Sequence, residues 1–175
     1  MKNFVYLLLL LASCSPMKIV YTKTTDTIDF NKYKTFNFYE LKASGDTTTK
    51  NFTGRTNILK HAIIGEMNKR GYLQTNTNPD LLINIGIVVR QQTDFRTDAT
   101  KYTGQQNYSL KSDKIIAGFF KEGAVTLDIV DAAQNSIVWK GSVEGIVPNN
   151  RSSLQKLAEN GMKKLFKKYP VEIKK

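Results

Sequence analysis

Alternation of apolar and polar residues predicts five β-strands along the chain. The clearest occupies residues 81–89, where every second residue is apolar: Leu81, Ile83, Ile85, Ile87 and Val89. Similar short runs rich in β-forming residues predict strands at 17–22, 34–39, 124–131 and 137–143. A short polar connection separates the last two, which are therefore expected to form an antiparallel hairpin.

Apolar residues recur at helical spacing in two further segments. The first segment contains Ile58, Leu59, Ala62, Ile63 and Met67. Gly71 should end this helix, because glycine accepts the left-handed conformation common just after a helix. The second helix is expected to begin at Ser152, with Gln155 completing a capping box, and to close at Pro170. Its apolar face is Leu154, Leu157, Ala158, Gly161, Met162, Leu165 and Phe166.

These elements predict an α+β fold, with a sheet of four or more mostly antiparallel strands and two amphipathic helices packed on one face. Residues 43–53 are polar and rich in threonine, and are expected to form a loop. The polar segment 91–112 has no sustained period, so it is either a long loop or a frayed extension of a hairpin.

The first fourteen residues indicate where the protein works. Lys2 precedes an uncharged apolar run over residues 4–11, which suits a secretory signal and is too short to span a bilayer. Ala12 and Ser13 then lead into Cys14, the only cysteine. Residues 11–14 resemble a bacterial lipobox, in which the cysteine sulfur receives a diacylglyceryl group and cleavage occurs between Ser13 and Cys14.

This interpretation divides the chain into a signal peptide at 1–13, a lipid-anchored tether at 14–16 and a single domain at 17–175. The alternatives for Cys14 are a buried thiol, a free thiol, or an ordinary signal peptide cut nearby. Lipidation would make the membrane a partner through Cys14. The outer membrane of a Gram-negative bacterium, on its periplasmic side, is favoured because Ser15 and Pro16 are not acidic.

The charge of the chain is the second feature that bears on membrane contact. The formal net charge is +11 and the pI is near 9.7, but the lysines are scattered and form no nucleic-acid-binding motif. Helical spacing groups Lys163, Lys164, Lys167 and Lys168 into a patch that would face anionic lipid or an acidic partner. A merely solvated lysine-rich end is the alternative.

Catalytic chemistry is not indicated by the sequence. His61 is the only histidine, so neither a triad nor a histidine-rich zinc site is expected, and no cofactor or metal motif appears. Asp128 and Asp131 lie three apart on a strand and should face opposite ways, with Asp131 shaping a turn. Thr27 and Thr47 follow aspartates in short sequences resembling O-glycosylation sequons.

Several motifs in order resemble one known family, the bacterial lipoproteins that carry the domain of unknown function 4136. The motifs are Asp29-Phe30, residues 33–36, Arg70-Gly71-Tyr72, residues 79–82, residues 122–131 and Val138-Trp139-Lys140-Gly141. The resemblance implies a compact α+β envelope lipoprotein and supplies no catalytic or ligand residue. The segment 91–112 has no counterpart in it.

Three classes of function follow. The sequence favours a non-enzymatic module that binds an envelope protein or polymer, because it combines an anchor with a compact domain. A carrier or chaperone for a lipid or small apolar ligand is the alternative and requires a cavity between sheet and helices. A hydrolase is the least favoured class, because no nucleophile and base are paired in the sequence.

Overall fold

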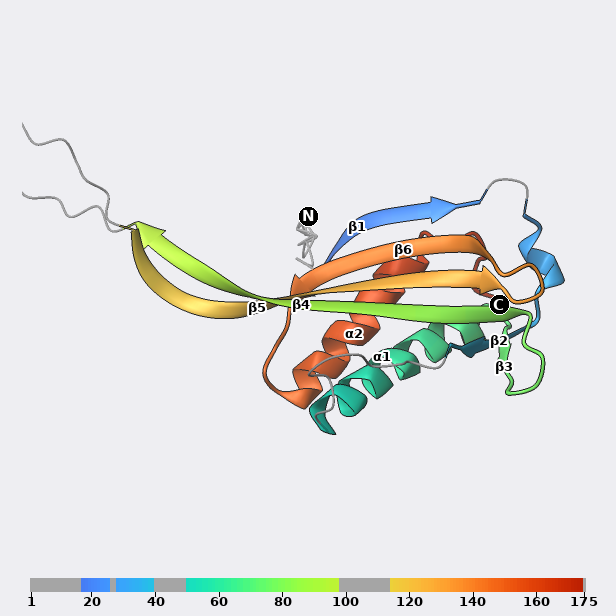
Figure 1. The fold of residues 1–175 in the computed structure, drawn as a ribbon, viewed down its shortest axis with the longest axis horizontal. Coiled ribbons are helices and arrows are strands. Elements are labelled where there is room, and N and C mark those ends of the chain that lie inside the picture. Colours follow the sequence, from blue (N-terminus) through green and yellow to red (C-terminus); the bar gives the residue numbers. More distant parts are fainter. Residues whose placement is uncertain (1–16, 26–27, 40–49, 98–113, 175) are drawn as a thin grey trace, which may run out of the picture.

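A computed structural model describes residues 17–25, 28–39, 50–97 and 114–174 (Figure 1). The elements in chain order are β1 (Met17–Thr24), the 3₁₀ turn η1 (Phe30–Lys32), β2 (Thr35–Phe38), α1 (Lys50–Lys69), β3 (Leu73–Gln74), β4 (Leu81–Thr97), β5 (Lys114–Asp131), β6 (Ser136–Ile146) and α2 (Arg151–Phe166).

The strands form one six-stranded sheet in the order β1-β6-β5-β4-β2-β3. Strands β4, β5, β6 and β1 pair antiparallel, whereas β2 pairs parallel with both β4 and β3. The sheet is therefore mixed, and the expectation of mostly antiparallel strands is confirmed. Residues 124–131 and 137–143 form the expected hairpin within β5 and β6.

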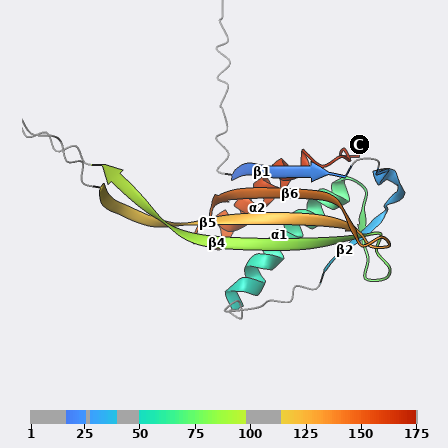
Figure 2. The ribbon, with the colours of Figure 1, turned by 45° about the horizontal axis from the view of Figure 1, so that its top comes forward.

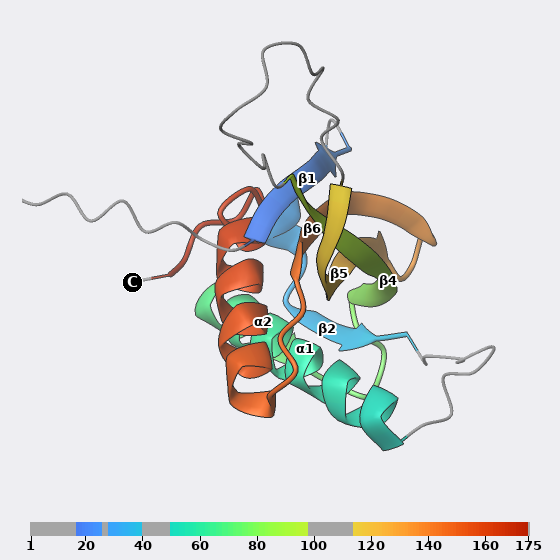
Figure 3. The same ribbon diagram turned by 90° about the vertical axis from the view of Figure 1, so that its left-hand side faces the viewer.

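Both helices cover the same face of the sheet, as Figure 3 shows, which confirms the predicted architecture. The space between the two layers is filled by large side chains that are completely buried: Trp139, Phe36, Phe166, Ile63, Met67, Leu81, Ile83, Leu127, Ile129, Met162 and Leu165. Burial of an aliphatic or aromatic side chain contributes about 1.5–3 kcal/mol, so this layer supplies the main stabilisation of the fold.

Two local signals were predicted at the helix ends, a glycine stop after α1 and a capping box at the start of α2. Gly71 has φ of 84° and the Tyr72 N–H donates to the Met67 carbonyl, so the predicted glycine stop is confirmed. The predicted capping box of α2 is wrong. Asn150 caps this helix, its Oδ1 accepting from the Ser153 N–H at 2.7 Å, while the Gln155 amide donates to Glu159.

Other boundaries differ from the sequence prediction. Residues 50–53 belong to α1 and not to the predicted loop, and their sequence shows no helical spacing of apolar residues that could have predicted this. Residues 91–97 continue β4, so the first part of the ambiguous segment is a hairpin extension, and residues 98–113 lie outside the described part. The two-residue strand β3 has no alternation that could have predicted it.

Neither helix in the described part of the chain is long and apolar enough to cross a membrane.

Candidate functional site

The first residue of β1 is fixed tightly against the last helix. Met17 is only 6% exposed, and Lys164 of α2 donates from Nζ to the Met17 carbonyl at 2.6 Å. The Met17 sulfur packs over Gly161, where a β-carbon would overlap it. The first strand therefore begins with a tightly packed residue, and an absent side chain at Gly161 creates the space for it.

A straight row of paired residues joins Met17 to the middle of the sheet. Met17 pairs with Gly145 of β6, Gly145 pairs with Gly123 of β5, and Gly123 pairs with Val89 of β4. This row marks the end of the sheet at which the chain enters from its first sixteen residues. Figure 2 shows β1 starting at this end.

Beyond this row, β4 and β5 continue alone as a two-stranded arm (Figure 1). The arm comprises residues 91–97 paired with 114–121, whereas the last pair of β5 with β6 joins Glu122 to Ile146. The pairing is regular except for a shift between Asp94 and Phe95. The arm thus projects from the same end of the sheet at which β1 begins.

The four lysines predicted to form a surface patch have different environments. Lys163, Lys167 and Lys168 are exposed, whereas Lys164 is half-buried and bonded to Met17. Lys164 therefore holds the start of β1 in place, which leaves the other three to meet a partner. Their contact with an anionic surface stays a prediction.

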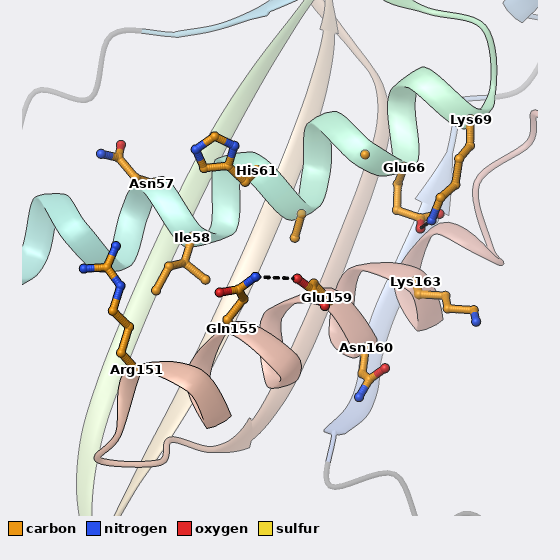
Figure 4. A pocket seen from close by; sticks show the side chains of 12 residues that line it. Asn57, Ile58, His61, Glu66, Lys69, Arg151, Gln155, Glu159, Asn160 and Lys163 are labelled. Atoms are coloured by element: carbon orange, nitrogen blue, oxygen red, sulfur yellow. Dashed lines mark hydrogen bonds and ion pairs between the residues drawn. The ribbon is translucent and has the colours of Figure 1, made fainter.

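A polar groove of about 630 Å³ runs between α1 and α2 (Figure 4). Its lining includes three cationic and two carboxylate side chains: Lys69, Arg151, Lys163, Glu66 and Glu159. His61 also lines it and is exposed. Glu66 is bound to Lys69 at 2.7 Å and Glu159 to Gln155 at 2.9 Å. The groove suits a polar segment of a partner better than an apolar ligand.

The buried side chain of Arg70 joins α1 to the end of α2. It donates to the Phe166 carbonyl at 2.8 Å, the Val171 carbonyl at 2.9 Å and the Glu66 carboxylate at 2.8 Å. Burial of Glu66 opposes its ionisation, but the bonds from Lys69 and Arg70 prevail and lower its pKa. This ion pair is satisfied within the fold.

A second buried carboxylate, Asp131, shapes the turn between β5 and β6. It accepts from the Tyr33 hydroxyl at 2.7 Å, the Lys32 ammonium at 3.2 Å and the backbone N–H groups of Ala133 and Gln134. Burial disfavours its charge, but these donors outweigh burial and lower the pKa to about 2. The predicted turn role of Asp131 is confirmed.

Asp80 has a similar role at the start of β4. It accepts from the backbone N–H groups of Lys34 and Thr35, at 2.7 and 2.9 Å, and these bonds lower its pKa. Trp139 and Tyr72 lie in the core, as expected. The motifs shared with the family thus mainly stabilise the fold, a role that spacing alone did not reveal for Arg70 and Asp80.

The remaining predicted sites lie outside the described residues: Ser13, Cys14, Thr27 and Thr47. Asp128 pairs with Lys140 at 3.1 Å on the sheet and lies on a different face from Asp131, as predicted. Within the ranges that the structure describes, no three His, Cys, Asp or Glu side chains form a group that could hold a metal ion.

Comparison with known proteins identifies a family and a fold. The sequence profile of DUF4136, a domain of unknown function, matches residues 20–171. No protein of curated function is detectably similar in sequence.

Two solved structures have a similar fold. A PDZ domain protein from Parabacteroides distasonis ATCC 8503 is 16% identical with a TM-score of 0.53, over 91% of this chain and 36% of that one. The chain therefore spans about a third of that protein. The PelC dodecamer from Paraburkholderia phytofirmans is 10% identical with a TM-score of 0.51, over 90% of this chain and 99% of that one. These likenesses show the fold alone.

Proposed function

The chain belongs to the DUF4136 family, and from this premise we propose that it is a lipid-anchored lipoprotein of the bacterial cell envelope, serving as a non-enzymatic binding or structural module. The lipobox at residues 11–14 supports the anchor, which would be a diacylglyceryl group on Cys14. More than one acyl chain gives stable membrane attachment.

One observation carries the proposal: a buried residue of the first strand, Met17, lies only three positions after Cys14. Met17 is buried and held by Lys164, so the tether has little freedom to move the domain away from the bilayer. Three residues span at most about 11 Å. A domain held this close suits a fixed contact at the membrane surface.

A binding module is favoured over a carrier because of how the interior is filled. Trp139, Phe36 and Phe166 are fully buried between the sheet and the helices, where a carrier would need an apolar cavity. The groove between α1 and α2 is polar and lies on the outer side of the helices. We take this groove as the surface that contacts an envelope protein or polymer.

A non-enzymatic role is supported by the state of the carboxylates whose pKa values are shifted. Glu66, Asp80 and Asp131 each accept bonds from residues of the fold itself, so their charges stabilise local structure. A catalytic carboxylate is instead aimed at a substrate within a cleft. His61 is exposed in the groove, and of these three carboxylates Glu66 lines the same groove and lies on the same helix.

Fractionation of cells tests the anchor. The parent protein is expected in the outer-membrane fraction, whereas Cys14→Ser should leave the membrane or remain an uncleaved precursor. Ser15→Ala is the matched control and should fractionate like the parent. A processed Cys14→Ser protein that stays in the membrane would contradict lipidation.

Site-specific crosslinking tests the binding role. A photoreactive residue at His61 should capture a partner, and the same residue at Asn84, exposed on β4, should not. The captured partner, once purified, should bind the parent at least tenfold more tightly than Arg151→Glu. Equal binding by both would exclude the groove as the contact surface.

A further inference from the structure

The chain enters β1 at the same end of the sheet from which the arm projects. β1 is antiparallel to β6, and β6 is antiparallel to β5, so β1 and β5 run the same way. Met17, the first residue of β1, therefore lies at the end of the sheet where the residues of β5 that precede Gly123 form the arm. The row that joins Met17 to Gly123 crosses β6 at Gly145, so the start of β1 lies two strands away from the start of the arm.

The arm reaches further than the tether. Seven residues of extended strand, 91–97, span about 24 Å at about 3.4 Å each. Cys14 and Met17 are three positions apart, so the chain between them spans at most about 11 Å. With the anchor inserted, this end of the sheet lies nearer to the headgroups than the arm is long.

The composition of the arm matches a membrane surface. Among its residues are two isoleucines, three phenylalanines and three cationic residues against one carboxylate: Ile115, Ile116, Phe95, Phe119, Phe120, Arg96, Lys114, Lys121 and Asp94. Aromatic and aliphatic residues partition to the headgroup boundary, and each lysine or arginine near anionic lipid is attracted by its negative surface potential.

In the described part of the chain, the base of the arm is joined to the rest of the fold by the Val147 N–H, which donates to the Lys121 carbonyl at 2.8 Å. In that part of the chain, residues 91–97 pair with β5 and with no other strand. An isolated two-stranded ribbon is marginally stable in water, and its open edges invite pairing. A surface that covers the ribbon would stabilise it and would shield its open edges from pairing.

We propose that the arm is a second membrane contact, lying in the anionic headgroup layer of the bilayer that holds the anchor. This inference rests on the proposed lipidation of Cys14. Two attachments, the acyl chains and the arm, would fix the orientation of the domain and direct the opposite end of the sheet, at the β5–β6 turn, away from the bilayer.

Depth-dependent quenching tests this orientation on the full-length lipidated protein. Thr97→Cys places a fluorescent probe in the arm, and Gln134→Cys places it in the β5–β6 turn as the matched control. Each protein is reconstituted in phosphatidylethanolamine–phosphatidylglycerol vesicles with headgroup-level quenching lipids. Quenching at residue 97 is expected to exceed that at residue 134 at least threefold, and to fall when phosphatidylcholine replaces the anionic lipid.

Equal quenching at the two positions would overturn the arm contact while leaving the anchor intact. Self-quenching between probes at residue 97, without lipid quenching, would assign the arm to a second copy of the chain and also overturn it. A thiol label reacting with Cys14 in the parent protein would instead refute the anchor, and with it this inference.

Discussion

Lys164 donates a hydrogen bond from its ammonium group to the main-chain carbonyl of Met17 at 2.6 Å. The contact joins the last helix to the first residue of the folded body, 147 positions away in sequence. A residue expected to face a partner thus fixes the point at which the chain enters the domain.

Replacing Lys164 by alanine should lower the free energy of unfolding by about 1–2 kcal/mol, because a charge-assisted hydrogen bond and its packed methylene chain are both lost. Lys163→Ala is the matched control and should change stability by less than about 0.5 kcal/mol. Urea denaturation measures both. Equal effects would show that the Met17 contact contributes nothing.

Gly161 and Gly65 offer a paired test of the space around Met17. Both are helical, and no atom lies near a β-carbon built at Gly65. Gly65→Ala should stabilise by about 0.5–1 kcal/mol through helix propensity. Gly161→Ala must displace the Met17 side chain, so it should gain less or destabilise. A similar gain at both positions, measured by thermal unfolding, would contradict tight packing at Gly161.

The periodic elements of this fold were predictable, because each buries one regular face. The strand at residues 81–89 and the helix around Leu165 follow this rule. Lys164 is an exception to this rule. Helical spacing alone groups this lysine with Lys163, and only its hydrogen bond to Met17 of β1 shows that it faces the fold. The arm was ambiguous for a related reason, since residues 91–97 and 114–121 pair with each other and their sequence shows no alternation of apolar and polar residues.

Capping and polar networks were harder to predict. Asn150, and not Ser152, caps α2, because the direction of the chain entering the helix selects among adjacent polar residues. Arg70 is recognisable as part of a motif, but its acceptors on Phe166 and Val171 come from the distant C-terminal segment. The lipid anchor, in contrast, is a prediction from sequence alone, because Cys14 lies outside the described residues.

Removing Arg70 should be among the most damaging single changes in the core. Arg70→Ala leaves the buried Glu66 carboxylate with Lys69 alone and should cost about 3–5 kcal/mol. Lys69→Ala should cost less than about 1 kcal/mol, because that side chain is 52% exposed. Adding Glu66→Gln to Arg70→Ala should recover part of the loss. Chemical denaturation that shows similar costs for Arg70→Ala and Lys69→Ala would contradict this account.

Asp131 should make stability depend on pH. Its pKa is about 2 in the folded protein against the usual 3.8. Its contribution is therefore complete above about pH 5 and is lost as the pH falls through 3.8 toward 2. Urea unfolding from pH 2 to 7 should show Asp131→Asn least stable relative to the parent near neutrality, with the gap narrowing in acid.

Tyr33→Phe provides the second variant for this test. It removes the 2.7 Å hydroxyl bond, so the pKa of Asp131 should rise toward its usual value and the acid-dependent part of the stability should shrink. A parent and an Asp131→Asn variant that differ by a constant amount across the pH range would rule out a depressed pKa for Asp131.

Mass spectrometry of the N-terminal peptide of the purified protein tests the central claim most directly. The account predicts that residues 1–13 are absent and that the peptide starts at Cys14 with a diacylglyceryl group on its sulfur. A mature protein that begins elsewhere, or that carries Cys14 as a free thiol, would contradict the lipid anchor on which the proposed function depends.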